Sequence, residues 1–237
     1  MSRALLEIEG LVAGYHGRPV LQEVSLAVPA GSVVGLIGPN GHGKSTLLRT
    51  VSGLLRATAG SVRFDGAEIA NRRPDEIVGR GLVQVPQGDL LFPEMTVIEN
   101  LLMGAYLAPA GEIAARLDEV VQLFPKLGER RRQVASTLSG GERRMVGIGR
   151  GLMAGGKLLM LDEPSLGLAP IVIEQIYEAI RRLAAGGRTV VIVEENASRL
   201  ADLAQELHLL DNGRFVWRGD GEALLRSPEI LESYLGS

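Results

Sequence analysis

A nine-residue stretch rich in glycine combines the residue types that bind phosphate groups. It reads Gly38-Pro39-Asn40-Gly41-His42-Gly43-Lys44-Ser45-Thr46 and matches the pattern G-x-x-x-x-G-K-[ST]. Glycines let successive backbone N–H groups turn toward one anion, and the N-terminus of a following helix adds its positive dipole end. We expect Lys44 to reach the β- and γ-phosphates of a nucleotide, and Ser45 to offer its hydroxyl to Mg²⁺.

The flanking segments distinguish a phosphate loop from an ordinary glycine-rich turn. Residues 32–37 form an apolar run rich in β-branched residues, which predicts a buried strand, and residues 47–54 have helical spacing with a glycine near their end. Lys44 is also one of only three lysines among 25 basic residues. A chain that uses arginine elsewhere therefore has a compact ammonium here, where a wide guanidinium would fit poorly between phosphates. The order of strand, loop and helix favours nucleotide binding.

Two carboxylates follow a second apolar run. Residues 158–161 read as a buried parallel strand, and Asp162 and Glu163 stand at its carboxyl end. Because consecutive strand side chains point to opposite faces, the two can take different roles. One suits Mg²⁺, a hard cation that prefers oxygen ligands, and the other can orient or deprotonate water. Taken alone, a strand-to-loop boundary explains the pair as well. Gln87 follows a strand that Pro86 ends, where α/β sheets place ligand contacts.

Two further segments have candidate binding residues. Tyr15 is flanked by glycines at positions 14 and 17, so its ring could stack on a base, although local sequence favours a turn tyrosine packed on the surface. Ser139-Gly140-Gly141-Glu142 reads as a helix start, with Ser139 as the cap and Glu142 facing the dipole. Such an end can bind phosphate, but the chain already has one phosphate loop. A second anion site makes sense if it completes the site of another copy.

Composition excludes several classes of protein. The chain has 237 residues, 46% hydrophobic and 22% charged, and its net charge of −3 argues against a nucleic-acid surface. Cysteine is absent, which excludes disulfides and cysteine-ligated metals. No apolar run approaches the roughly 18 residues that span a bilayer, and acidic residues occupy the place of a signal peptide's apolar core. We expect a cytoplasmic protein whose membrane role would need a partner.

The remaining pattern predicts an α/β fold with a mainly parallel sheet, an N-terminal antiparallel β portion and an inserted helical subdomain. We expect one domain over residues 1–237, with its core formed by 1–86 and 155–237 and the helical part by about 87–154. Expected strands span 5–9, 20–28, 60–65, 81–87, 157–163, 188–193, 207–210 and 214–217. Expected helices span 74–80, 97–107 after a Thr96–Glu99 capping box, parts of 108–135, 141–154, 170–185, about 198–204, and two short C-terminal segments. Arg130, Arg131 and Arg132 are expected on a solvated helix face.

With these parts in order, the chain resembles the ATP-binding subunit of an ABC transporter over nearly its whole length. The resemblance implies a P-loop NTPase core that binds ATP and Mg²⁺. Residues 38–46 match the Walker A loop, residues 158–163 the Walker B strand, and residues 139–142 the signature that contacts ATP of the other subunit. It also implies that Glu163 is the catalytic carboxylate, Asp162 a Mg²⁺ support and Tyr15 the adenine-stacking ring. Gln87 matches the Q-loop glutamine, which contacts Mg²⁺ and senses the membrane subunit, and residues 165–170 match the D-loop.

Finer features are similar to the branched-chain amino acid importer subfamily and, more loosely, to importers of urea and amides. They are residues 85–88, 91–93, 103–106, 165–170, 193–197 and 234–236. The implied function is an ATPase that powers import of a small polar solute. The implied partners are a second ABC ATPase subunit, identical or paralogous, two transmembrane permease subunits and, indirectly, a solute-binding protein. The chain would then lie on the inner face of the cell membrane.

Three features depart from the family pattern. The switch position, histidine in many ABC ATPases and glutamine in this subfamily, is Glu195. Two unit charges about 4 Å apart at an effective dielectric near 20 repel by roughly 4 kcal/mol, so an ionised Glu195 cannot sit against the γ-phosphate. Glu195 must therefore be protonated, turn away from the γ-phosphate or slow hydrolysis at its ATP site. We expect an asymmetric pair of subunits in which the partner chain supplies a better switch residue. The side chain of His42 is expected to point outward. Gly147, Gly149 and Gly151 indicate either close helix packing or a softer signature helix.

Two other functions compete with the transporter ATPase. An ATP-gated dimerisation clamp with little turnover would explain Glu195. A soluble ABC protein of translation or DNA repair usually fuses two nucleotide domains or has a long coiled-coil insertion, and 237 residues hold neither.

Overall fold

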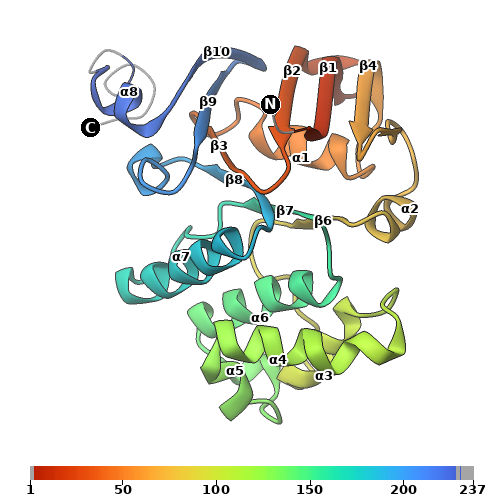
Figure 1. Cartoon of the computed structure of the whole chain (residues 1–237), viewed down its shortest axis with the longest axis vertical. Coiled ribbons are helices and arrows are strands. Elements are labelled where there is room, and N and C mark those ends of the chain that lie inside the picture. The colour runs from red at the N-terminus through yellow and green to blue at the C-terminus, as the bar shows by residue number, and fades with distance from the viewer. Residues whose placement is uncertain (1–2, 228–229, 231–237) are drawn as a thin grey trace.

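Two sheets of different character place the candidate residues (Figure 1). In the computed structural model, which describes residues 3–227 and 230, the larger sheet has the order β10-β9-β3-β8-β7-β6. Its pairs are parallel except for the antiparallel edge pair β9–β10. The strands are β3 (Val33–Ile37), β6 (Leu82–Val85), β7 (Leu158–Asp162), β8 (Thr189–Glu194), β9 (Glu206–Asp211) and β10 (Arg214–Gly219). The mainly parallel sheet is as predicted, and so is the hairpin turn at residues 211–213.

The N-terminal sheet is antiparallel, as predicted, but its strands are longer than expected. It has the order β2-β1-β4-β5, formed by β1 (Ala4–Tyr15), β2 (Arg18–Pro29), β4 (Ala57–Phe64) and β5 (Ala67–Glu68). The predicted first strand stopped at Glu9 because Gly10 interrupts the alternation. In the structure Gly10 has φ +55° beside a register shift, so an irregularity resets the alternation and the strand continues to Tyr15.

Four of the helices lie together at one end of the molecule. Figure 1 shows α3, α4, α5 and α6 at one end of the molecule, away from β1, β2 and β4, and these helices lie between β6 and β7 in sequence. The helices are α1 (Lys44–Val51), α2 (Pro74–Gly79), α3 (Val97–Gly104), α4 (Ile113–Leu123), α5 (Pro125–Glu129), α6 (Gly140–Met153), α7 (Pro170–Ala185) and α8 (Gly221–Leu225). Short 3₁₀ turns lie at Ala110–Glu112, Ala135–Thr137 and Ala197–Arg199. Within the described ranges, no helix combines the length and the apolar character that crossing a bilayer requires.

Several helix predictions are confirmed and others are wrong. The Thr96–Glu99 capping box is present, but α3 ends at Gly104 rather than Leu107. The helix predicted near 198–204 is only a 3₁₀ turn: Asn196 caps it, but the N–H groups of Leu200 and Leu203 bond to carbonyls three residues back. Arginines 130–132 are exposed, but they follow the end of α5 at Glu129. The second predicted C-terminal helix and residues 234–236 lie outside the described residues.

The two faces of the larger sheet belong to different hydrophobic clusters. Leu158 and Met160 of β7 pack with residues of α1 and the N-terminal sheet, whereas Leu159 and Leu161 pack with residues of α6 and α7. This alternation follows from the two-residue period of a strand. Asp162 continues the series of Leu158 and Met160, so the pleat directs its side chain toward α1, the helix that follows the phosphate loop.

Close packing accounts for the glycines of α6. A Cβ atom on Gly149 would lie 2.9 Å from both Leu101 Cδ2 of α3 and Val120 Cγ1 of α4, and one on Gly151 would lie 2.5 Å from Val85 Cγ2. On Gly147 it would lie 3.2 Å from the carbonyl oxygen of Asp89. Of the two explanations that the sequence left open, the structure supports packing against neighbouring helices and strands.

Adding a methyl group inside this packing should destabilise the protein. We expect Gly149→Ala to lower the free energy of unfolding by roughly 1 kcal/mol or more, because overpacking costs about 1–3 kcal/mol and the gain in helix propensity is only about 0.5–1 kcal/mol. The matched control is Gly79→Ala at the exposed end of α2, where no heavy atom lies within 4 Å of the new methyl. Urea unfolding of both variants checks this, and equal stabilisation of the two would contradict the packing account.

Candidate functional site

The glycine-rich loop joins β3 to α1 and is already folded around its lysine. Gly38 and Gly43 have φ of +144° and +110°, and a Cβ on Gly38 would collide with the carbonyl oxygen of Leu210. Lys44 is buried, and its Nζ donates to the carbonyl oxygens of Gly38 at 2.6 Å and Pro39 at 3.0 Å. Burial lowers the pKa of Lys44, and the nearby carboxylates, Glu163 first, oppose that shift. The loop therefore holds an ammonium at its centre.

Asp162 lies against the first turn of α1, as the pleat of β7 requires. Its Oδ1 accepts a hydrogen bond from Ser45 Oγ at 3.0 Å. The side chain is buried, which raises the pKa of Asp162, while the Ser45 hydrogen bond and nearby cations oppose that shift. A hydroxyl and a carboxylate thus stand together at the edge of the phosphate loop.

Glu163 faces a different neighbour because the chain bends sharply after β7. Its φ is +46°, in the left-handed region that L-residues rarely adopt. Glu163 Oε2 accepts from Gln87 Nε2 at 3.0 Å, and Oε1 lies 4.0 Å from Lys44 Nζ. Burial raises the pKa of Glu163, and the charge of Lys44 opposes the shift. The sequence predicted that strand alternation would separate Asp162 from Glu163, but β7 ends at Asp162 and the turn at Glu163 separates them instead.

These groups surround one cavity of about 320 Å³. It is lined by Asn40, Gly41, Gly43, Lys44, Ser45, Thr46, Gln87, Glu163 and Leu166. The structure thus brings together the loop, the candidate glutamine and one candidate carboxylate from segments far apart in sequence. Tyr15, His42, Ser139, Gly141, Glu142 and Glu195 are not among the lining residues.

The predicted helix start at Ser139 is present. Ser139 Oγ accepts from the N–H of Glu142, and Glu142 Oε2 accepts from the Ser139 N–H at 2.9 Å, which forms a capping box. Gly140 lines a neighbouring cavity of about 460 Å³ that also touches Gln87 and Glu163. Ser139 and Gly140 are exposed to solvent. The helix end is therefore open to a group outside this chain.

Two other candidates lie on the surface near the loop. Tyr15 ends β1 with 39% of its surface exposed, and its hydroxyl lies 3.4 Å from Arg49 Nη1. The side chain of His42 lies outside the lining of the 320 Å³ cavity, and its Nδ1 lies 2.6 Å from Asp211 Oδ1. The N–H of Gly213 also donates to the carbonyl oxygen of His42 at 3.0 Å. His42 thus connects the loop to the β9–β10 hairpin.

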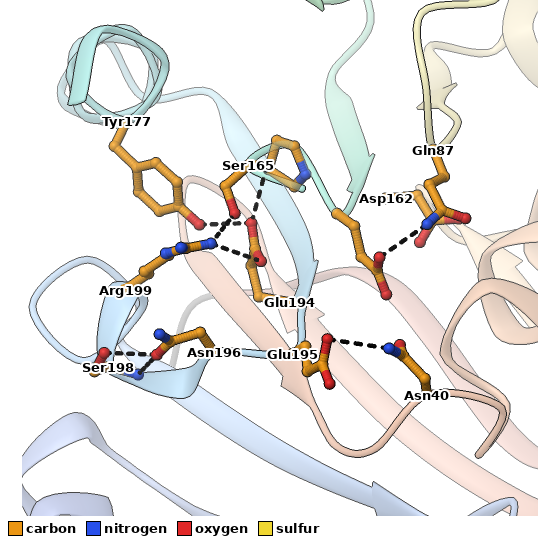
Figure 2. A network of polar contacts seen from close by, with 12 residues as sticks. Asn40, Gln87, Asp162, Ser165, Tyr177, Glu194, Glu195, Asn196, Ser198 and Arg199 are labelled. Carbon is orange, nitrogen blue, oxygen red and sulfur yellow. Dashed lines mark hydrogen bonds and ion pairs between the residues drawn. The ribbon is translucent and has the colours of Figure 1, made fainter. Parts of the chain in front are cut away.

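Glu195 turns toward the phosphate loop. Figure 2 shows its carboxylate facing Asn40, whose Nδ2 donates to Glu195 Oε2 at 3.0 Å. Glu195 is exposed, whereas Asn40 lines the 320 Å³ cavity. A negative charge consequently stands at the rim of the cavity, beyond its lining.

The preceding residue, Glu194, is a buried carboxylate that sequence reasoning missed. Its Oε1 accepts from Tyr177 Oη at 2.8 Å and from the N–H of Ser165 at 3.2 Å, and its Oε2 lies 3.9 Å from Arg199 (Figure 2). Arg199 also donates to Ser165 Oγ. The burial and the carboxylate together raise the pKa of Tyr177 far above its usual value. The available signal was a tyrosine on the apolar face of the predicted helix 170–185, beside a strand that ends in two glutamates.

Known proteins resemble the chain over almost its whole length. The ABC transporter family profile matches residues 21–166. BraG of Pseudomonas aeruginosa, a high-affinity branched-chain amino acid transport ATP-binding protein, is 46% identical over 226 residues, which cover 95% of this chain and 97% of BraG. LivF of Archaeoglobus fulgidus is 34% identical over 233 residues, covering 98% and 99%. The ADP conformation of MJ1267, an ATP-binding cassette of an ABC transporter, superposes with a TM-score of 0.86 at 31% identity and covers 98% of each chain. These likenesses confirm the predicted fold class.

Removing the hydroxyl that binds Glu194 should weaken the fold around the site. We expect Tyr177→Phe to lower the free energy of unfolding by about 1–3 kcal/mol, because a buried carboxylate oxygen loses a donor. Tyr106→Phe is the matched control, since Tyr106 is 84% exposed. Thermal and urea unfolding measure both variants, and a Tyr177→Phe protein as stable as the control would show that the contact contributes nothing.

Proposed function

Because the chain belongs to the ABC transporter family of ATP-binding proteins and is an ATPase of that family, we propose that it energises the import of a small polar solute through a membrane partner. One observation carries the proposal: the two carboxylates at the end of β7 meet the phosphate loop on two sides, Asp162 at Ser45 and Glu163 at Lys44. This supports the proposal, because one carboxylate is available beside the hydroxyl expected to bind Mg²⁺ and the other is available to orient the attacking water.

Lys44 is proposed to bind the β- and γ-phosphates of ATP. Its Nζ donates to the carbonyl oxygens of Gly38 and Pro39, which orients the ammonium within the loop. The N–H groups of residues 38–46 and the N-terminus of α1 would surround the remaining phosphate oxygens. Tyr15 is proposed to stack on the adenine ring, which its exposed position permits.

The oxygen atoms beside the loop fit Mg²⁺. Ser45 Oγ and Asp162 Oδ1 lie 3.0 Å apart, and both are hard donors of the kind that Mg²⁺ prefers. Mg²⁺ commonly takes one or two protein ligands and fills its other positions with phosphate and water oxygens. Ser45, Asp162 and the Gln87 side chain would hold the ion, which would neutralise charge on the phosphates when bound.

Glu163 is proposed to orient and deprotonate the attacking water. Its raised pKa makes it a better proton acceptor than an exposed glutamate, and Lys44 at 4.0 Å keeps the ionised form accessible. Gln87 donates to one oxygen of Glu163, which leaves the other oxygen on the Lys44 side. Gln87 would thus fix the direction in which Glu163 accepts a proton.

The site is proposed to be completed by a second ABC ATPase subunit, identical or paralogous. Ser139 and Gly140 are exposed at the start of α6, and neither lines the chain's own 320 Å³ cavity. In a head-to-tail pair, residues 139–142 of each subunit would contact the γ-phosphate held by residues 38–46 of the other. Binding of the γ-phosphate would close the pair and hydrolysis would open it.

An apolar groove offers a place for the permease. A cavity of about 420 Å³ lies between the α3–α6 helices and the larger sheet, and the exposed side chains of Leu90, Phe92 and Met103 line it. Gln84 and Pro86, just before Gln87, line it as well. We propose that transmembrane permease subunits dock here, which would place the chain on the cytoplasmic face of the cell membrane. A solute-binding protein would act through the permease.

Branched-chain amino acids are the proposed solute class. The support is the likeness to BraG, a branched-chain amino acid transport ATP-binding protein, and the resemblance of residues 85–88 and 193–197 to the importer subfamily. Urea or amide import is the alternative, and uptake of labelled leucine and labelled urea by cells with and without this chain separates the two.

Replacing the proposed base should abolish turnover while ATP still binds. We expect Glu163→Gln to lower kcat by at least about 100-fold, the usual range for loss of a general base, with the ATP Kd within a few-fold of wild type. Glu119→Gln, which removes a half-exposed carboxylate paired with Arg188, is the control. Phosphate release and nucleotide binding are the measurements. If wild type and Glu163→Gln release phosphate at the same low rate, the ATP-gated clamp replaces the ATPase proposal.

Glu195 is proposed to weaken its own site, within an asymmetric pair whose partner supplies a better switch residue. We expect Glu195→Gln to raise ATPase turnover or ATP affinity by roughly 3- to 30-fold, because it removes a charge at the cavity rim that solvent only partly screens. Glu23→Gln, at an exposed position on β2, controls for net charge. Unchanged turnover and affinity in the Glu195 variant would refute the idea.

A further inference from the structure

One buried arginine holds the backbone on both sides of two site residues. Arg144 of α6 is 4% exposed, and its guanidinium donates to four carbonyl oxygens among the described residues. Nη1 donates to Pro86 at 2.8 Å and to Gly88, Nη2 to Asp162 at 2.8 Å, and Nε to Pro164 at 3.2 Å. Pro86 and Gly88 flank Gln87, whereas Asp162 and Pro164 flank Glu163. Arg144 therefore binds the residues on either side of Gln87 and on either side of Glu163.

The two segments held by Arg144 present side chains that bind each other. Gln87 Nε2 donates to Glu163 Oε2 at 3.0 Å, and both side chains line the 320 Å³ cavity. Glu163 also has the uncommon φ of +46°, which surrounding contacts must hold in place. Arg144 binds the carbonyls before and after this residue, so it holds that backbone turn together with the bond from the Glu163 N–H to the carbonyl oxygen of Val193 at 3.0 Å.

The charge of Arg144 has no direct carboxylate partner within 4.0 Å in the part of the chain that the structure describes. It acts at longer range on Asp162, Glu194, Asp89 and Glu163, while burial lowers its pKa. A guanidinium has five donors in a planar fork, and a lysine ammonium in its place would reach fewer of these four carbonyls. The geometry, as well as the charge, is specific to arginine.

Arg144 also lies on the helix that begins at Ser139. Its α-carbon is in the second turn of α6, whose N-terminus is the exposed capping box. The contacts therefore link the open helix end, the glutamine segment and the end of β7 in one body.

We propose that Arg144 is a positioning residue that holds Glu163 and Gln87 in place for hydrolysis and fixes them to the helix start offered to the second subunit. The proposal rests on the proposed function, because it takes Glu163 and Gln87 to act on ATP. Arg144 is not among the residues that line the 320 Å³ cavity. Because α6 connects these residues, contact between Ser139 and the γ-phosphate bound by a partner subunit would also affect the positions of Glu163 and Gln87 in the subunit that contributes Ser139.

The test compares Arg144→Lys and Arg144→Gln with matched variants of Arg116. Arg116 of α4 is also mostly buried and pairs with Glu112. It donates to the carbonyl oxygen of Met153, the last residue of α6, at 2.9 Å. Nucleotide Kd, kcat and the thermal midpoint are measured for all four variants and for wild type. We expect a 10- to 100-fold loss of kcat in Arg144→Lys and a larger loss in Arg144→Gln, with Kd within about 3-fold. Both Arg116 variants should keep kcat within about 2-fold.

The outcomes separate this proposal from the function on which it rests. If wild type lacks ATPase activity, the proposed function fails. If wild type is active and Glu163→Gln is not, but folded Arg144→Lys and Arg144→Gln match the Arg116 variants, the positioning role is refuted. Loss of affinity in step with kcat would also refute it, because that indicates a general structural role.

Wild-type protein provides a measurement that does not depend on how the variants fold. If Arg144 holds segments 86–89 and 162–165 together, the two should open together, so hydrogen exchange should give the same opening free energy for both. Clearly different values for the two segments would overturn the proposal even if Arg144→Lys fails to fold.

Discussion

Three carboxylates, those of Asp162, Glu163 and Glu194, are buried at the adjoining ends of β7 and β8, and the surrounding structure must compensate for them. An ionised group removed from water is costly unless hydrogen bonds and opposite charges replace its hydration. Here each carboxylate has its own donor: Ser45 for Asp162, Gln87 for Glu163 and Tyr177 for Glu194. The buried cations Lys44 and Arg144 stand on two sides of the group. Much of the architecture around the site follows from this requirement.

The same requirement explains why distant segments meet. The phosphate loop contributes Lys44, α6 contributes Arg144, and Gln87, which follows β6, contributes its side-chain amide. These polar groups connect the larger sheet to the helices α3–α6. The parallel order β3-β8-β7-β6 places the carboxyl ends of these strands along a single edge. The side chains that follow these strands therefore lie close together in space although they are far apart in the sequence.

Local chemistry made much of this predictable. The phosphate loop, the capping boxes at Thr96 and Ser139 and the helix at 170–185 depend on residues within a few positions of one another, and the structure contains all of them. Features that depend on tertiary contacts were missed. Nothing near Arg144 in sequence indicates that its donors reach residues 86–88 and 162–164, and the bond between His42 and Asp211 joins positions far apart in the chain. The helix predicted near 198–204 was wrong, since the N–H groups of Leu200 and Leu203 bond three residues back, as in a 3₁₀ turn.

The central claim is that this chain holds half of each ATP site and that another subunit's residues at the Ser139 position supply the rest. The most direct test is the structure of Glu163→Gln with ATP and Mg²⁺, purified together with its membrane partners. The account predicts that Lys44 Nζ leaves the carbonyls of Gly38 and Pro39 for the phosphates, and that the γ-phosphate also contacts the helix start of a second ABC subunit. ATP enclosed within one subunit, with Ser139 still facing solvent, would contradict the account.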